Sequence, residues 1–593
     1  MSSSDNVNTL GFSSMSKGFE ANYKQLEELM SKFSSSHEDV NYDPFNLQQA
    51  WKDWLAAAAQ NPEKLVEANM AMMQDTMKLY QQAALRMWNQ SSDPVIKEEK
   101  GDRRFRHDDW NEQPVFEAIK QSYLLSSKWI RKVVSDVEGL DEATSQKMEF
   151  FTERLLDAMS PTNFAATNPA VLEKIKQTNG ANLVHGLKNM LDDLEDGDGQ
   201  LRIKMTDNTA FELGVNVAVT PGKVVFENRM FQLIQYSPTT ETSFKRPLLI
   251  TPPWINKFYI LDLQPKNSML RWLVEQGHTV FVMSWINPDE SYKDTGFDAY
   301  VLEGVMEAVN QVEKATGESS INAIGYCIGG TLLATTLSYM KEKGDTRIHS
   351  ATFFTTMIDF SEPGDLGIFV DEDQLQSLEE KMSETGFLEG RDMAGTFNLM
   401  RANDLIWSFY INNYLLGNDP RPFDLLYWNS DSTRMPCTMH SEYLRNMYLN
   451  NLLVEPGGIT IDGVAIDINQ IDTPACFIST VDDHIAPWKS TYAGAKRFNG
   501  SVKFILGGSG HIAGIINPPD ANKYGFRTTS KLPTDCEAWA EKAEQHEGSW
   551  WPEWQRWIKQ KAGKQVAARI PGDNQLDVIE DAPGSYVKTR VVD

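Results

Sequence analysis

The chain contains a cysteine in a setting that suits a nucleophile. Cys327 lies in the segment GYCIGG (325–330), directly after the apolar run INAI and before the helix-forming stretch TLLATTLSYMKEK. A nucleophile elbow requires this order of strand, tight turn and helix, because the nucleophile takes strained backbone angles and the flanking glycines give the turn room. With 38 glycines and 4 cysteines in the chain, the pattern G-x-C-x-G is expected by chance only about 0.02 times. We therefore predict that Cys327 is a thiol nucleophile rather than a small buried core residue.

Two further residues have the types and positions of an acid and a base. In α/β-hydrolases the order along the chain is nucleophile, acid and histidine. Asp483 follows the apolar run ACFIST and His511 follows VKFILGGSG, so both come just past a predicted strand, where catalytic residues of open α/β sheets gather. Taken singly, Asp483 is equally a turn former and His511 a capping or core histidine. Their order favours a triad with Cys327, for which Asp482 is a rival acid and His484 either orients a group or packs.

A third segment is placed to supply an oxyanion hole. The residues TPPWINK (251–257) follow the apolar run RPLLI, at the point where α/β-hydrolases provide one backbone amide. Ile255 or a neighbour would donate one N–H group, and Ile328, directly after the nucleophile, would donate the other. Asn256 is a possible auxiliary residue, as is His484. The proline pair is equally well explained as the end of a strand.

The elements that would position these residues begin at about residue 206. From there to residue 593, short apolar runs that suit strands alternate with helical stretches, and residues 211–219 and 223–236 suggest an antiparallel pair around Pro221-Gly222. This alternation predicts an α/β-hydrolase-type fold, with a mostly parallel sheet covered by helices on both faces. Residues 1–205 lack strand-like alternation and predict a helical N-terminal domain. We therefore predict two domains, 1–205 and 206–593.

Between residue 359 and about residue 458 the alternation lapses. This aromatic-rich segment has the size of an inserted cap rather than of a loop. It would act as a mobile cap that shuts out solvent, or it would pack a contact between two copies of the chain. Its aromatic residues include Trp407, Tyr410, Tyr414, Phe423, Tyr427 and Trp428.

Residues 45–88 are rich in Ala, Leu, Met, Gln and Glu, with apolar residues recurring every three or four positions. The pattern predicts two helices that separate near Asn61-Pro62. Their stripe of Met and Trp residues would pack in a core or between domains, or would face a surface or a partner helix.

Composition bounds the class of protein. The chain has 593 residues, of which 41% are hydrophobic and 23% charged, as expected of a globular protein. Its four cysteines lie far apart and show no metal-binding spacing, so we expect no metal and a reducing cytoplasm. We find no secretory signal and no run of 18 apolar residues, which predicts no export and no membrane span. The net charge of −26 argues against nucleic-acid binding. A polyanionic ligand would need a local positive patch, and the sequence does not show which Lys and Arg residues would form it.

Several motifs resemble those of class I polyhydroxyalkanoate synthases. These are GYCIGG, PPWINKFYILDLQP, FDLLYWNSDST, VDDHIAPW, GSGHIAGIINPP and GSWWP, with DRRF (102–105) further upstream. The resemblance covers the chain from about residue 100 to its end. It implies a triad of Cys327, Asp483 and His511 that polymerises (R)-3-hydroxyacyl-CoA of short chain, such as 3-hydroxybutyryl-CoA, with release of CoA. It also implies a cytoplasmic enzyme without a cofactor, bound to polyester granules and granule-associated proteins, and active as a homodimer.

A thiol nucleophile suits such chain growth. Transfer of the acyl group from CoA to Cys327 exchanges one thioester for another and so conserves activation for the next step. His511 would take the thiol proton, and Asp483 would orient His511 or help to activate the attacking 3-hydroxyl group. Two alternatives are a thioesterase or polyester hydrolase of the same fold, and a non-catalytic granule-associated protein. Release of CoA with polymer, release with free acid, and no release would separate the three.

Overall fold

The computed structural model describes residues 45–60, 62–88, 93–197 and 199–590. Contacts divide the chain into two compact units, residues 1–52 and 53–593. The first part of the predicted helical domain, residues 1–44, lies outside the described residues, and the domain boundary near residue 206 stays a prediction. No helix in the described ranges is both long enough and apolar enough to cross a membrane.

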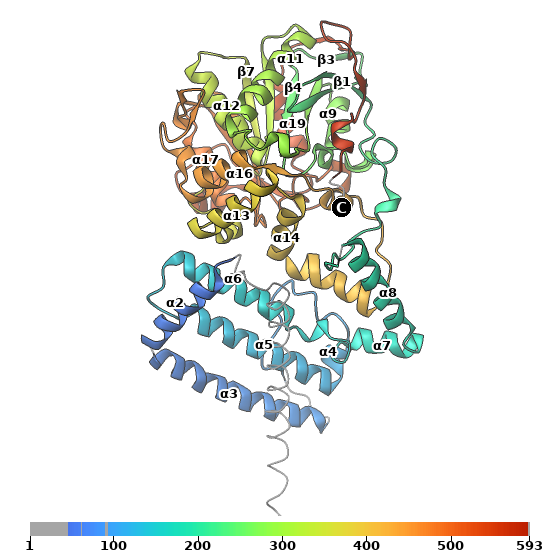
Figure 1. Ribbon diagram of the computed structural model, residues 1–593, viewed down its shortest axis with the longest axis vertical. Helices are drawn as coiled ribbons and strands as arrows, with labels where there is room; N and C mark the ends of the chain where they lie inside the picture. Colours follow the sequence, from blue (N-terminus) through green and yellow to red (C-terminus); the bar gives the residue numbers. More distant parts are fainter. Residues whose placement is uncertain (1–44, 61, 89–92, 198, 591–593) are drawn as a thin grey trace, which may run out of the picture. The chain divides into compact units, whose positions relative to one another are not determined.

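Helices form the described chain up to residue 196, as predicted. They are α2 (Leu47–Gln60), α3 (Pro62–Met87), α4 (Asp109–Glu112), α5 (Pro114–Ser135), α6 (Glu142–Ala158), α7 (Pro169–Thr178) and α8 (Ala181–Asp196). The predicted break falls between α2 and α3, at Asn61, which is outside the described residues. Asp141 begins α6, because its side chain accepts a hydrogen bond from a backbone N–H group of the first turn. Leu125 and Trp129 of α5 bury apolar surface against Ala68 of α3, and Figure 1 shows the two helices side by side.

A large, mostly parallel sheet follows, which confirms the predicted fold class. Among the described residues it has 11 strands, in the order β15-β14-β13-β12-β7-β6-β4-β5-β2-β1-β17. The strands from β13 to β5 in this order are parallel, and those beyond them on both sides are antiparallel. Their bounds are β1 (Gly222–Glu227), β2 (Phe231–Tyr236), β4 (Leu248–Thr251), β5 (Val280–Trp285), β6 (Ile321–Tyr326), β7 (Ile348–Phe354), β12 (Ala475–Thr480), β13 (Val502–Gly507), β14 (Phe526–Thr528), β15 (Glu544–His546) and β17 (Glu580–Asp581).

Helices cover both faces of this sheet. They include α9 (Met269–Glu275), α11 (Glu307–Thr316), α12 (Ile328–Glu342), α17 (Trp488–Arg497) and α19 (Trp551–Lys559). In β6, Ala323 packs in the core shared with α11, α12 and α17, whereas its neighbour Ile324 packs in the core shared with α9 and α19. Since both faces of the strand are buried, β6 shows no alternation of buried and exposed residues, and Asn322, the polar residue of the run INAI, is buried as well.

The first hairpin differs from the prediction. The structure pairs β1 with β2 around Asn228, and residues 211–219 form no strand of the sheet. The Asn228 side chain accepts hydrogen bonds from the backbone N–H groups of Met230 and Phe231, at 2.9 Å and 3.0 Å. Such a side-chain contact fixes a turn without glycine or proline, so the prediction favoured the more conspicuous Pro221-Gly222 pair and was wrong there.

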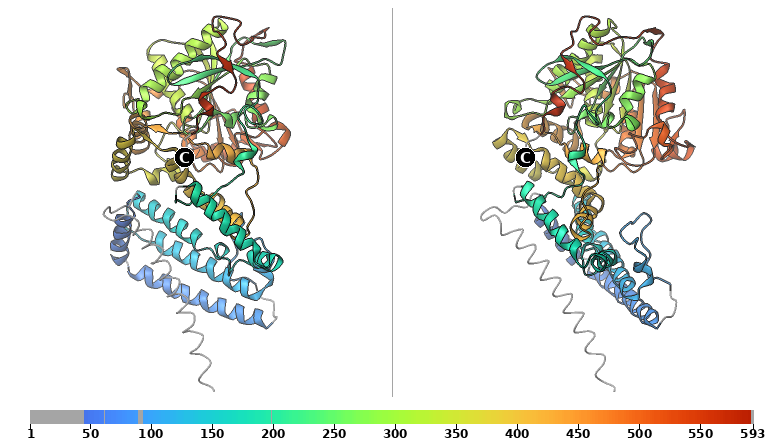
Figure 2. Two further views of the ribbon diagram at one scale, coloured as in Figure 1. Left: turned by 45° about the vertical axis from the view of Figure 1, so that its right-hand side comes forward. Right: turned by 90° about the vertical axis from the view of Figure 1, so that its right-hand side faces the viewer.

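Between β7 and β12 the chain leaves the sheet, and the segment predicted as a cap (residues 359–458) lies in this excursion. Its helices are η7 (Gly364–Phe369), α13 (Glu372–Thr385), α14 (Gly390–Met400), η8 (Asn403–Trp407), η9 (Tyr410–Leu415), α15 (Asp424–Ser430), α16 (Cys437–Tyr443) and η10 (Leu444–Leu449), of which η8, η9 and η10 are π-helical. Asn182 of α8 donates to the Leu415 carbonyl at 2.8 Å, and the Tyr414 hydroxyl donates to Asp193 of α8 at 2.5 Å. The views in Figures 1 and 2 agree that η9 lies along α8.

Candidate active site

Cys327 lies at the tip of a sharp turn between β6 and α12. Its backbone has φ 53° and ψ −124°, a strained combination for a residue with a side chain. The turn is held by the Cys327 N–H group, which donates to the Phe354 carbonyl at 2.9 Å. It is possible only with glycine on both sides, because a Cβ atom on Gly325 would lie 2.4 Å from Gly330 Cα, and one on Gly329 would lie 2.4 Å from the Thr251 carbonyl oxygen. The geometry is that of a nucleophile elbow.

His511 and Asp483 are joined by a buried hydrogen bond. The distance between His511 Nδ1 and Asp483 Oδ2 is 2.8 Å, and both residues are buried. The other carboxylate oxygen of Asp483 accepts from the backbone N–H groups of Ile485 and Ala486, at 2.9 Å and 2.8 Å. The carboxylate is therefore fixed, and it occupies Nδ1 of the imidazole. Nε2 is left as the nitrogen that can exchange a proton with Cys327.

The charges of the site favour a protonated His511. Burial lowers the pKa of His511, but the negative charges of Asp483 and Cys327, with the hydrogen bonds to both, raise it to about 10. The imidazole is thus near enough to Cys327 for its charge to act on it. An imidazolium beside a thiolate is the state from which a cysteine attacks.

Three tyrosines surround the thiol and the imidazole. The ring of Tyr326 stacks on that of His511 with centroids 5.9 Å apart, and its hydroxyl donates to the His511 carbonyl at 3.3 Å. Burial, and then the charge of Cys327, raises the pKa of Tyr448, and the same charge acts on Tyr443. Tyr443 and Tyr448 belong to α16 and η10 of the cap and their ring centroids lie 5.7 Å apart, so the cap supplies an aromatic wall near Cys327.

The aromatic residues singled out in the sequence lie elsewhere. Tyr414 bonds to α8, whereas Tyr427 packs on Phe211 and Tyr259 with ring centroids 5.0 Å and 6.2 Å apart. Tyr443 and Tyr448 were missed, because the local sequence gives no sign of which turn of the cap faces the elbow. Their spacing of five residues matches the π-helical winding of η10. This spacing was the sequence signal that could have indicated that the two side chains share one face.

The predicted oxyanion-hole residues lie on the segments expected. Ile328 is the first residue of α12, so its N–H group has no partner within the helix. The segment with Ile255 starts next to Gly329, as the close approach of Thr251 shows, and the Ile255 carbonyl accepts from the Thr433 hydroxyl of the cap at 2.6 Å. Asn256 forms a β-bridge with Ser432 of the cap. The roles of Ile255, Ile328 and Asn256 in catalysis stay predictions.

Asp483 differs from Asp482 and His484 in its burial and its hydrogen bonds. Asp482 is exposed, whereas Asp483 is buried and bonded to His511. Burial, and then the charge of Arg401, lowers the pKa of His484 to about 4, so that this imidazole is neutral near pH 7. His484 Nδ1 is buried and has no hydrogen-bond partner among the described residues. His484 is thus beside the site but outside the hydrogen bond that joins Asp483 to His511.

Comparisons with known proteins identify the family of the chain. The chain matches the family described as "Poly-beta-hydroxybutyrate polymerase (PhaC) N-terminus" over residues 101–273, and the family described as "alpha/beta hydrolase fold" over residues 248–518. It is 48% identical to the poly(3-hydroxyalkanoate) polymerase of Methylorubrum extorquens over 545 residues, which cover 92% of this chain and 89% of the relative. It is 40% identical to the poly(3-hydroxyalkanoate) polymerase subunit PhaC of Cupriavidus necator over 544 residues, 91% of this chain and 90% of the relative. An acyltransferase-type enzyme of polyester synthesis, this chain belongs to the poly(3-hydroxyalkanoate) polymerase family.

Proposed function

We propose that the enzyme polymerises short-chain (R)-3-hydroxyacyl-CoA, such as 3-hydroxybutyryl-CoA, through a thioester on Cys327. The observation that carries the proposal is the strained elbow at Cys327 beside the buried His511–Asp483 hydrogen bond. The strained backbone exposes sulfur at the end of the sheet, and the charged pair supplies the base. The printed names of the relatives support the polyester as product.

The first half-reaction loads the thiol. His511 Nε2 takes the proton of Cys327 Sγ, and the sulfur attacks the thioester carbonyl of the substrate. The resulting oxyanion accepts hydrogen bonds from backbone N–H groups, for which Ile328 and Ile255 are the candidates. The bond between the carbonyl carbon and the CoA sulfur then breaks, and His511 returns its proton to the departing CoA thiolate. One thioester replaces another.

The second half-reaction extends the chain. The 3-hydroxyl group of an acyl unit loses its proton to His511 Nε2, and its oxygen attacks the thioester carbonyl on Cys327. An ester bond forms and the bond to sulfur breaks, after which the sulfur recovers the proton from His511. Asp483 holds the imidazole in one orientation and stabilises its positive charge. The wall of Tyr443 and Tyr448 favours attack by the hydroxyl group over attack by water.

The location, oligomeric state, cofactor requirement and partners of the enzyme are proposals as well. We expect a cytoplasmic homodimer that needs no cofactor and binds polyester granules and granule-associated proteins. The α3 helix supports a role of the helical region at an apolar surface, because it exposes Val66, Met70, Met73 and Met77.

The test follows free CoA and insoluble polyester together, with purified protein and 3-hydroxybutyryl-CoA. Cys327→Ala should abolish both products, whereas Cys536→Ala, which changes a free thiol on another helix, should retain both. Release of CoA with free hydroxy acid and no polymer would identify a thioesterase. Turnover that survives in Cys327→Ala would contradict the nucleophile, and no turnover in the wild type would contradict the enzyme function.

A further inference from the structure

A large cavity lies between the N-terminal helices and the cap. Its volume is about 940 Å³, at the upper end of the range for cofactor-sized ligands. Its walls come from the loop of residues 99–110, from α5 and α6, from residues 162–170, and from the cap at residues 401–411. The described contacts of the triad lie outside it. The cavity therefore requires an explanation of its own.

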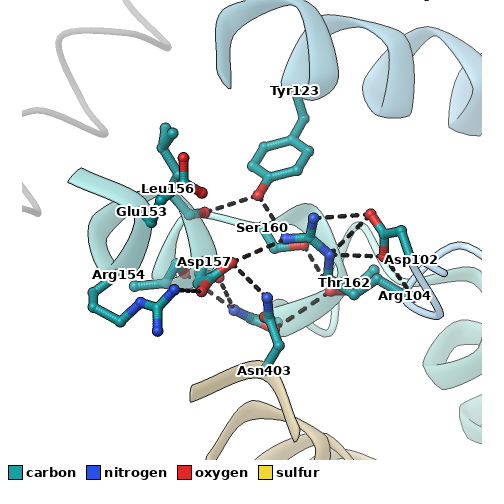
Figure 3. Close-up of polar contacts among 12 residues, drawn as sticks. Asp102, Arg104, Tyr123, Glu153, Arg154, Leu156, Asp157, Ser160, Thr162 and Asn403 are labelled. Atoms are coloured by element: carbon teal, nitrogen blue, oxygen red, sulfur yellow. Dashed lines mark hydrogen bonds and ion pairs between the residues drawn. The ribbon is translucent and has the colours of Figure 1, made fainter. Parts of the chain in front are cut away.

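The floor of the cavity is a closed network of charges, drawn in Figure 3. Arg104 donates to both carboxylate oxygens of Asp102, at 3.0 Å and 2.9 Å, and to the Tyr123 hydroxyl at 2.8 Å. Asp157 lies 3.4 Å from both Arg104 and Arg154. Burial lowers the pKa of Arg104, but the hydrogen bond to Asp102 and the charges of its acidic neighbours raise it above its usual value, so the guanidinium stays charged. These groups neutralise one another and give the cavity a rigid base.

The acidic residues that line the cavity are all paired. Arg131 bonds to Glu99 and to Glu153, Arg104 to Asp102, and Arg401 to Asp404, while Asp157 belongs to the floor. The cavity lining holds seven Lys and Arg residues against five Asp and Glu residues. This excess is the reverse of the whole chain, which has 56 basic and 82 acidic residues. The cavity is thus a local positive site on an acidic protein.

The lining cations without an acidic partner are three residues of one loop. Lys100, Arg103 and Arg106 are exposed, and none of them has an acidic partner within 4.0 Å among the described residues. Two buried polar atoms of the lining, Arg154 Nε and Asn403 Oδ1, also have no hydrogen-bond partner in the part of the chain that is described. A buried donor and a buried acceptor left unpaired cost free energy unless a ligand or water completes them. The cavity therefore offers free cations at its rim and unused hydrogen-bonding groups within.

Two residues of the cap lie both at the cavity and near His484. Arg401 and Asp404 line the cavity, and the charges of both act on His484, which precedes the buried loop that holds Asp483 in place. A ligand with its charged end in the cavity could thus extend a flexible arm past Arg401 and Asp404 towards His484.

We propose that this cavity binds the phosphorylated nucleotide end of the acyl-CoA substrate, with Arg103 and Arg106 contacting its phosphate groups. The inference rests on the proposed function, which supplies the ligand class. Arginine side chains bind phosphate in bidentate fashion, and Asn403 Oδ1 can accept a hydrogen bond from an amino or hydroxyl group of the nucleotide. The pantetheine arm then extends past Arg401 towards His484 and Cys327. The N-terminal helical region is in this view part of the substrate site.

The experiment compares two substrates on the full-length protein. The double variant Arg103→Gln/Arg106→Gln should raise KM for 3-hydroxybutyryl-CoA at least about tenfold and change kcat little, since two charge-assisted contacts to phosphate are lost. The same variant should leave KM for the 3-hydroxybutyryl thioester of pantetheine, which has no phosphate, as in the wild type. The matched control Lys266→Gln/Lys542→Gln removes two exposed charges outside the cavity and should leave both KM values as they are.

Two outcomes of the kinetic comparison would overturn the inference. An unchanged KM for the CoA substrate would show that the loop does not contact the phosphates, and an equal rise for both substrates would show a general disturbance of the fold. Binding of CoA, of adenosine 3′,5′-bisphosphate and of inorganic phosphate to Cys327→Ala, followed by calorimetry, gives a readout without turnover. The first two should bind in the Cys327→Ala background and lose affinity on loss of Arg103 and Arg106. Equal affinity for inorganic phosphate would identify a general anion site and contradict the nucleotide assignment, whereas absence of turnover with intact CoA binding would contradict only the proposed function.

Discussion

At the scale of single residues, the site depends on one strained backbone and one buried carboxylate. Cys327 keeps its unusual angles because the elbow is enclosed by glycines and by the backbone of two neighbouring strands. Asp483 keeps its place because two backbone N–H groups bind the oxygen that does not face His511. One oxygen of the Asp483 carboxylate is thus held by the backbone, and the other binds His511. A substitution of the same shape can therefore remove the negative charge and keep the hydrogen bonds from the backbone.

Asp483→Asn is such a substitution. The amide retains an oxygen for the backbone N–H groups but loses the negative charge that raises the pKa of His511. We expect the rate of CoA release to fall by about 10³- to 10⁴-fold, because the imidazole loses its preferred tautomer and the partner of its positive charge. Titration of the His511 ring by NMR should show a lower pKa. Asp482→Asn, at the exposed neighbour, serves as the control, and a comparable loss of rate there would favour Asp482 as the acid.

At the scale of elements, much of the fold follows from local patterns in the sequence. The short, mainly apolar runs predicted the parallel strands β6, β7, β12 and β13, because strands buried on both faces are rich in apolar residues. The elbow was equally local, since strand, turn and helix are adjacent in the chain. The first hairpin was mispredicted because its turn is fixed by the side chain of Asn228 rather than by a turn residue with a special backbone.

A buried histidine next to the sheet gives a prediction about pH. His278 precedes β5, donates a hydrogen bond from Nε2 to Gln555 Oε1 of α19 at 3.0 Å, and has a pKa that burial lowers to about 4. Because the unfolded chain binds a proton near pH 6.5 and the folded protein does not, this group's contribution to stability is complete above pH 6.5. It is lost as the pH falls towards 4, by about 3 kcal/mol in total.

Urea unfolding between pH 7 and pH 4 measures this loss. The His278→Gln variant keeps a polar side chain at the position and removes the titrating group. We expect the decline of the unfolding free energy with falling pH to be shallower in His278→Gln than in the wild type. Identical slopes in the two proteins would show that His278 is not responsible for acid sensitivity.

At the scale of the whole molecule, segments far apart in the sequence meet in the cap. Asp193 is buried and accepts hydrogen bonds from the Tyr414 hydroxyl and from the Lys204 N–H group. The cavity likewise joins Arg103 to Arg401 across the chain. Neither meeting could be predicted from the sequence, because no local pattern says which surface helix receives an inserted segment. That Tyr443 and Tyr448 lie near Cys327 could not be predicted for the same reason, although their spacing could have indicated that they share one face of a π-helix.

Tyr414→Phe tests whether the N-terminal helices hold the cap in place. The substitution keeps the ring and leaves the Asp193 carboxylate without one partner, so we expect unfolding to require about 1–3 kcal/mol less. If a looser cap admits water, the ratio of free hydroxy acid to polyester should rise. Tyr410→Phe is a matched control, because Tyr410 packs edge-on against Tyr414 with ring centroids 5.6 Å apart and no hydrogen bond of its hydroxyl is found among the described residues. A cap held by other contacts would leave the product ratio unchanged in both variants.

The π-helical winding of the cap has a mechanical consequence. A turn of η8, η9 or η10 contains one residue more than an α-helical turn would need. Rewinding such a turn as α-helix passes the extra residue along the chain, and every later side chain rotates by about 100° around the helix axis and advances by about 1.5 Å. In η10 this step would carry Tyr448 off the face that it shares with Tyr443. The extra residue in η10 would thus allow Tyr448 to move away from Tyr443 by rewinding, without breaking the helix.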